Sequence, residues 1–135
     1  MTFVDSNALL DALTEDPKWG PWSSAAIEAA TADGGLLIND IVYAELAVGF
    51  PTIESLDHFV AEVGLKIVPM PRSALYLAAK THLRYRRAGG TRTSVLPDFF
   101  IGAQAAVSSA AVLTRDARRF RTYFPTVELI SPETD

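Results

Sequence analysis

Two acidic residues each follow a short apolar stretch that is predicted to be a β-strand. Asp5 comes directly after residues 2–4, and Asp116 comes shortly after residues 111–113. In an open parallel sheet, ligands bind at the carboxyl ends of the strands. A carboxylate placed there beside apolar neighbours must be hydrated, paired or bound to a metal ion. These two positions therefore mark one edge of the predicted sheet as a candidate site.

Two further acids reach the same edge from predicted helices. Asp98 begins a helix that would pack beside the sheet, and Glu45 lies in the helix 41–48. Capping of free backbone N–H groups would by itself explain Asp5, Asp98 and Asp116. It does not explain Glu45, because the helix is apolar nearly all round and an isolated buried carboxylate is costly, although Glu45 could be its one solvated position. Converging carboxylates raise one another's pKa, and a hard divalent cation is the most favourable way to keep them ionised.

The elements that position these acids alternate along the chain between short apolar strands and helices. The predicted strands are 2–4, 36–38, 66–68, 111–113 and 127–130, and the predicted helices are 8–15, 23–31, 41–48, 52–63, 73–88, 97–109 and a last one ending at 123. Residues 18–22 are predicted to be a loop, with Ser23 or Ser24 capping the next helix and Asn39 and Asp40 capping a later one. The alternation predicts crossover connections, and hence an α/β fold with a central, mostly parallel sheet of four to five strands.

The bulk composition fits one domain over residues 1–135 in a reducing compartment. The chain is 49% hydrophobic and contains no cysteine, which excludes disulfides and thiolate metal sites. No apolar stretch is long enough to span a membrane, and the N-terminus lacks the pattern of a signal peptide, so we expect a cytoplasmic protein. The formal net charge of −4 argues against a general nucleic-acid coat protein.

The four acids and their neighbours resemble the acidic positions of the PIN-domain nucleases. The matching segments are DSNALL (5–10), ELAVG (45–49), LPDFFIGA (96–103) and LTRD (113–116). More narrowly, the chain resembles the VapC toxins of bacterial type II toxin–antitoxin pairs. The resemblance covers almost the whole chain, with the segments in the same order as in the family.

The resemblance implies an α/β/α sandwich and an endoribonuclease that depends on Mg²⁺, with Mn²⁺ as a possible substitute. It implies that the metal is bound by Asp5, Glu45, Asp98 and the more variable Asp116, with Asn7 and Thr114 as supporting polar residues. It further implies a tRNA, ribosomal RNA or messenger RNA substrate, an antitoxin encoded alongside, and a homodimer, with no membrane partner. No histidine, cysteine or serine–lysine arrangement offers a protein nucleophile, so the residue types favour attack by metal-activated water, with one ion or two.

Eight arginines gather in two segments despite the acidic net charge. They are Arg84, Arg86, Arg87 and Arg92 in the first segment and Arg115, Arg118, Arg119 and Arg121 in the second. The first segment ends a predicted helix, where cations are favourable for local reasons alone. Contact with RNA phosphates at the rim of the site is the alternative for both segments. We predict RNA contacts at Arg84, Arg86, Arg87, Arg92 and Arg115.

Several rival interpretations stay open. A phosphatase of the haloacid dehalogenase type has Asp-x-Asp after its first strand, where this chain has Asn7 at the second acidic position. A receiver domain needs an acidic pair at the same place. A non-catalytic RNA-binding or partner-binding module would use the acids only as caps. A PIN-type RNA-processing nuclease without an antitoxin would share the whole site.

Overall fold

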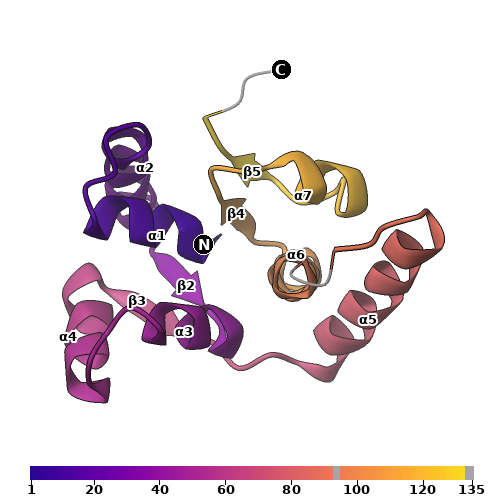
Figure 1. Ribbon diagram of the computed structural model, residues 1–135, viewed down its shortest axis with the longest axis horizontal. Helices are drawn as coiled ribbons and strands as arrows, with labels where there is room; N and C mark the ends of the chain where they lie inside the picture. Colours follow the sequence, from indigo (N-terminus) through magenta and orange to yellow (C-terminus); the bar gives the residue numbers. More distant parts are fainter. Residues whose placement is uncertain (93–94, 133–135) are drawn as a thin grey trace.

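The centre of the fold is a sheet of five parallel strands in the order β3-β2-β1-β4-β5 (Figure 1). The strands are β1 (Thr2–Val4), β2 (Leu36–Ile38), β3 (Leu65–Ile67), β4 (Ala111–Leu113) and β5 (Leu129–Ile130). The structure is a computed structural model and describes residues 1–92 and 95–132. The middle strand, β1, pairs with β2 on one side and β4 on the other. The predicted α/β class with a parallel sheet is confirmed.

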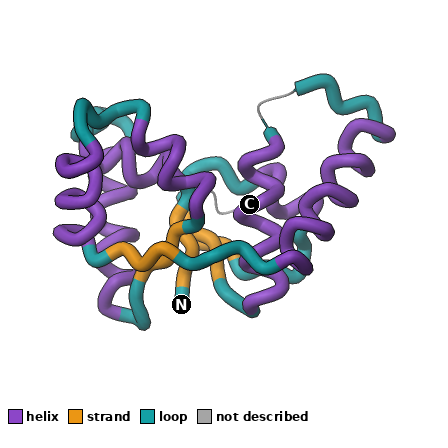
Figure 2. The backbone as a smooth tube through the Cα atoms, turned by 90° about the horizontal axis from the view of Figure 1, so that it is seen from below, coloured by secondary structure: helices purple, strands orange, loops and turns teal. Residues whose placement is uncertain are grey.

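Helices flank the sheet on two sides, so that the strands lie between two helical groups (Figure 2). The helices are α1 (Ser6–Leu13), α2 (Gly20–Ala32), α3 (Asp40–Ala47), α4 (Ile53–Val63), α5 (Arg72–Arg87), α6 (Leu96–Ser108) and α7 (Arg118–Tyr123). Helix α1 packs against α2 in one group, and α5 packs against α6 in the other. In the described part of the chain, no helix is both long and apolar enough to cross a membrane.

Helix α2 begins earlier than the sequence predicts. Residues 20–22 are helical rather than part of a loop. Pro21 is tolerated there because the N–H groups of the first helical turn have no carbonyl partner within the helix, so the N–H that proline lacks is not missed. Ser23 does not cap the helix. Its side chain is buried, and its hydroxyl donates a hydrogen bond of 3.5 Å to Oδ2 of Asp11. Ser24 also lies inside the helix, since the N-cap position is Trp19. The loop prediction for residues 20–22 and the cap prediction at Ser23 or Ser24 are therefore wrong.

A buried pair of amides ties together the two helices that carry Glu45 and Asp98. Asn39 caps α3, as predicted, because its Oδ1 accepts the N–H of Val42 at 3.0 Å. Its Nδ2 donates to Oε1 of Gln104 on α6 at 3.1 Å. Both amide side chains are fully buried, where an unmade hydrogen bond costs roughly 1–3 kcal/mol. This link fixes α3 and α6 relative to each other, and with them the two acids.

Aromatic packing holds the start of α6 in place. The buried ring of Phe99 lies 5.6 Å from that of Tyr85, 5.4 Å from Tyr123 and 6.1 Å from Phe124, measured between centroids. One turn further on, Gly102 lets Phe124 approach closely, since a Cβ at this position would lie 2.4 Å from the Phe124 ring. Asp98, the residue before Phe99, is thus carried by a tightly packed helix end.

Candidate active site

Asp5 is a buried acid at the carboxyl end of the central strand. Its side chain is 5% exposed and makes no capping hydrogen bond to α1, although the residue occupies the N-cap position. The hydroxyl of Thr114 donates to Oδ2 of Asp5 at 3.0 Å. Burial above all, and then the negative charges of Asp98 and Glu45, raise the pKa of Asp5 to about 7. Helix capping therefore does not account for this residue.

Glu45 faces Asp5 from α3. The hydroxyl of Ser6 donates to Oε1 of Glu45 at 3.0 Å, which links the start of α1 to α3. Burial is the main cause that raises the pKa of Glu45, with a further rise from the charge of Asp98. The half-buried Glu45 is thus turned towards the other acids, and the sequence did not single out Ser6 as its partner.

Asp98 completes the group from the first turn of α6. Burial raises the pKa of its carboxyl group, against the opposing effect of the neighbouring Arg119 guanidinium. Nη1 of Arg119 lies 2.5 Å from Oδ2 of Asp98, and both side chains are partly exposed. Asp116, exposed after β4, adds a repulsive charge that also raises the pKa of Asp98. The structure therefore brings all four predicted acids within electrostatic reach of one another.

The chemistry of the four carboxylates fits a hard divalent cation, because such an ion prefers oxygen ligands. It would also keep ionised the three acids whose pKa is raised, Asp5, Glu45 and Asp98. As the side chains stand, no three acids or histidines in the described residues are placed to hold one metal ion together. Asp98 is paired with Arg119 instead. Closing the acids around an ion requires side-chain movement, and above all a change in this ion pair.

Asn7 and Thr114, the two predicted supporting residues, form a hydrogen-bonded bridge between the ends of β1 and β4. Nδ2 of Asn7 donates to Oγ1 of Thr114 at 3.4 Å, and Oδ1 of Asn7 accepts the N–H of Arg115 at 3.4 Å. The fully buried Thr114 hydroxyl also accepts the N–H of Asp116 at 3.1 Å while it donates to Asp5. These contacts orient Asp5 and anchor the loop that carries Asp116.

The Arg115 side chain is already in contact with other side chains of the protein. Its Nε lies 2.7 Å from Oδ2 of the buried Asp11, in an ionic contact that ties the loop after β4 to α1. Its guanidinium also lies over the ring of Trp19, 6.0 Å from the centroid. Asp11 therefore competes with any phosphate for this cation, and an RNA contact at Arg115 stays a prediction.

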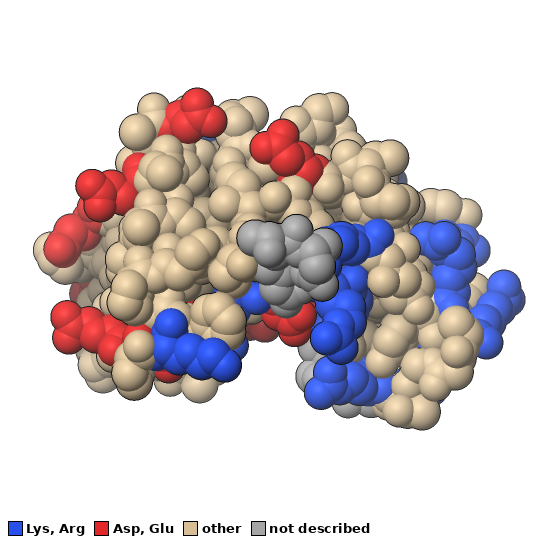
Figure 3. Space-filling view, turned by 90° about the horizontal axis from the view of Figure 1, so that it is seen from above, with Lys and Arg blue, Asp and Glu red and all other residues tan. Residues whose placement is uncertain are grey.

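The other predicted RNA contacts lie near the end of α5. Arg84, Arg86 and Arg87 occupy its last turn, where the helix dipole favours cations, and Arg92 follows in the next loop. Figure 3 shows that most Lys and Arg side chains of one face gather over one half of it, while the acids lie mostly over the other half. All four arginines are exposed, and their contacts with RNA remain predictions.

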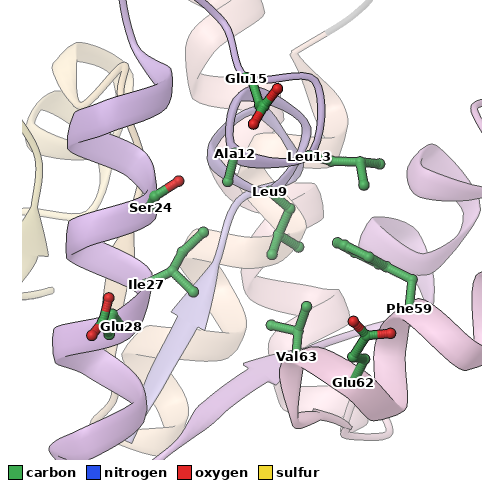
Figure 4. A pocket seen from close by; sticks show the side chains of 10 residues that line it. All are labelled: Leu9, Ala12, Leu13, Glu15, Ser24, Ile27, Glu28, Phe59, Glu62 and Val63. Carbon is green, nitrogen blue, oxygen red and sulfur yellow. The ribbon is translucent and has the colours of Figure 1, made fainter.

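An apolar groove of about 470 Å³ lies between α1, α2 and α4 (Figure 4). Its apolar lining consists of Leu9, Ala12, Leu13, Ile27, Phe59 and Val63. Three acids, Glu15, Glu28 and Glu62, also line it and stand around the apolar side chains. The sequence pattern did not predict this groove, because the same apolar residues fit the buried faces of three amphipathic helices equally well.

The comparisons with known proteins agree with this geometry. The family model described as PIN domain matches residues 2–124. A search of curated proteins gives no match. At sequence identities below 25%, the likeness to solved structures shows the fold.

Three solved structures illustrate the likeness. VapBC2 from Rickettsia felis, bound to a DNA fragment from its promoter, is 17% identical with a TM-score of 0.73 over 98% of each chain. A toxin-antitoxin complex from Klebsiella pneumoniae is 17% identical with a TM-score of 0.70 over 100% of each chain. FitAcB from Neisseria gonorrhoeae is 20% identical with a TM-score of 0.66 over 98% of each chain.

Proposed function

The chain belongs to the PIN-domain family, and from this premise we propose that it is a metal-dependent endoribonuclease, the toxin of a toxin–antitoxin pair. The observation that carries the proposal is the convergence of Asp5, Glu45 and Asp98 at the carboxyl edge of the sheet, each with a raised pKa. Such coupled, perturbed acids are costly to the fold and are characteristic of functional sites. The toxin–antitoxin complexes among the structural neighbours support the biological role.

We infer that Mg²⁺, or Mn²⁺ in its place, is held by Asp5, Glu45 and Asp98 with help from Asp116. When bound, the ion would supply positive charge and an activated water for hydrolysis of a phosphodiester bond. The chain's own part is to position the ligands: Thr114 orients the Asp5 carboxylate, and Ser6 orients that of Glu45. The arginines at the end of α5 are available to hold the RNA backbone.

The experiment that tests this function is cleavage of total RNA and tRNA by the purified protein in Mg²⁺, Mn²⁺ or EDTA. We expect cuts that need the metal, and a loss on the order of 10³-fold in Asp98→Asn, which keeps the side-chain size but removes the charge. Asp33→Asn, an exposed acid after α2, is the matched control and should cleave like the wild type. Circular dichroism would show that both variants are folded.

Two results would count against the nuclease proposal. One is a wild-type protein that cuts none of these RNAs in either metal. The other is metal-dependent cleavage of equal rate in wild type and Asp98→Asn. Either would favour a binding module in which the acids have no catalytic part.

The apolar groove supports the antitoxin part of the proposal. Its floor is apolar and three glutamates line it, so it suits a helix with an apolar stripe flanked by Lys or Arg. A charge placed within the groove should therefore disrupt the partner without touching the acid cluster. Leu13, 42% exposed and part of the lining, is the residue to change.

We expect Leu13→Asp to weaken binding of the antitoxin by at least about tenfold, because a carboxylate in an apolar contact is desolvated without a partner. Co-purification with the product of the adjacent reading frame would measure binding, and RNA cleavage should be unchanged. A wild-type protein with RNA cleavage but no such partner would favour the RNA-processing alternative. A homodimer also remains a prediction, which light scattering would check.

A further inference from the structure

A polar hollow of about 310 Å³ lies beside the acid cluster. Its lining consists of Arg92, Asp116, Arg118, Arg119, Thr122 and Tyr123. We call it the arginine hollow. Asp116 belongs both to this hollow and to the candidate active site, so the two share a wall.

The hollow concentrates positive charge. In the described residues, neither the Arg92 nor the Arg118 side chain pairs with an acid, and both residues are exposed. The Thr122 hydroxyl donates to the Arg118 carbonyl at 3.1 Å, and the charged donors of the lining are the guanidiniums. Guanidinium groups match the geometry of phosphate oxygens. The chemistry of the hollow therefore fits a phosphate group.

Arg119 connects the hollow to the acids. It lines the hollow while its Nη1 contacts Asp98 at 2.5 Å. One side chain thus reaches both places, and a phosphate in the hollow lies one arginine away from Asp98. A guanidinium carries five N–H donors, and the contact with Asp98 uses Nη1, so the remaining donors of Arg119 can meet a ligand in the hollow.

We propose that the arginine hollow binds a backbone phosphate of the RNA substrate adjacent to the bond that is cut, and that Arg119 and the metal ion compete for Asp98. The proposal rests on the proposed nuclease function. A guanidinium and a divalent cation at one carboxylate repel each other, so occupation of the acid cluster releases Arg119 towards the phosphate. By linkage, RNA in the hollow draws Arg119 from Asp98 and strengthens metal binding to the same degree.

The first arm of the test measures RNA binding without turnover. A 5′-labelled single-stranded RNA of mixed sequence is titrated with protein in EDTA at several NaCl concentrations, and fluorescence anisotropy gives the affinity. Arg118→Ala should weaken binding several-fold and reduce the slope of log affinity against log salt by roughly 0.7, the value for one lost phosphate contact on a single strand. Arg72→Ala, at the first residue of α5 and exposed, is the matched control and should change neither quantity.

The second arm measures metal binding without RNA. Calorimetric titration with Mn²⁺ should show at least about fivefold tighter binding in Arg119→Met, because the ion no longer has to displace a cation from Asp98. Methionine keeps much of the arginine side chain's length, and Arg118→Ala should bind Mn²⁺ like the wild type. Equal or weaker Mn²⁺ binding in Arg119→Met would overturn the competition.

The two proposals fail in different ways. If the wild type cleaves RNA but Arg118→Ala keeps the full salt slope, the arginine hollow is not a phosphate site and the nuclease function stands. If the wild type neither binds nor cleaves any RNA, the nuclease function fails and the hollow fails with it.

Discussion

Asp5→Asn is expected to lower metal-dependent RNA cleavage by about 10³-fold or more while making the metal-free protein more stable. Asparagine can still accept the hydrogen bond from Thr114, but it carries no charge to desolvate and none to repel Glu45 and Asp98. Activity and stability should therefore move in opposite directions. RNA cleavage in Mg²⁺ and thermal unfolding in EDTA at pH 8 would measure the two effects.

Asp11→Asn is the matched control for this stability effect. Asp11, which lies in α1, is also a buried acid, but the positive charge of Arg115 compensates its negative charge. Its replacement leaves Arg115 without its partner and should lower the free energy of unfolding by about 1–3 kcal/mol. A loss of stability in Asp5→Asn as large as that in Asp11→Asn would show that Asp5 is compensated after all.

The metal-free protein is expected to lose stability as the pH rises from 5 to 8. The pKa of Asp5 is 3.8 for the ordinary side chain and about 7 in the fold, so between these values the folded state binds a proton that the unfolded state has released. The stabilisation that comes from this bound proton is complete below pH 4, falls as the pH approaches 7 and is absent above pH 7. The expected loss is on the order of 2 kcal/mol, with a limiting slope of about 1.4 kcal/mol per pH unit. Glu45 and Asp98, whose pKa values are also raised, act in the same direction.

Chemical denaturation in EDTA at a series of pH values would measure this dependence. In Asp5→Asn the slope between pH 5 and 7 should shrink. In saturating Mg²⁺ it should flatten or reverse in the wild type, because the ion binds the ionised carboxylates. A wild-type stability that rises steadily from pH 5 to 8 in EDTA would contradict the raised pKa of Asp5.

Much of the fold could be predicted because its signals are local. Most strands are short apolar runs bounded by turn residues, and Asp5, Asp98 and Asp116 follow a strand or lie in the first turn of a helix, so the parallel arrangement itself directs these acids to one edge. Glu45 lies later in its helix and was singled out because the residues around it are apolar. The cap at Asn39 was predictable for the same reason. The start of α2 was not, because Gly20 and Pro21 are as typical of a loop as of a first helical turn.

The partners of the acids could not be predicted, since they depend on packing between distant segments. Arg119 pairs with Asp98 across the contact of α7 with α6, and Arg115 pairs with Asp11 on α1. In the sequence these two arginines look alike, as members of one basic segment. Only the three-dimensional structure shows that Arg119 lines the arginine hollow and that Arg115 ties the loop after β4 to α1.

The position of β1 in the middle of the sheet has a consequence for the newly made chain. β1 is synthesised long before one of its two partners, β4, and Asp116 comes after β4. At ordinary translation speeds, roughly 6 to 22 seconds separate the addition of residue 4 from that of residue 116, and until then the four carboxylates cannot share an edge. A chain that stops before residue 111 therefore lacks both β4 and Asp116, and with them the complete acid cluster. If the protein harms the cell that makes it, that harm begins only after residue 116 has been made.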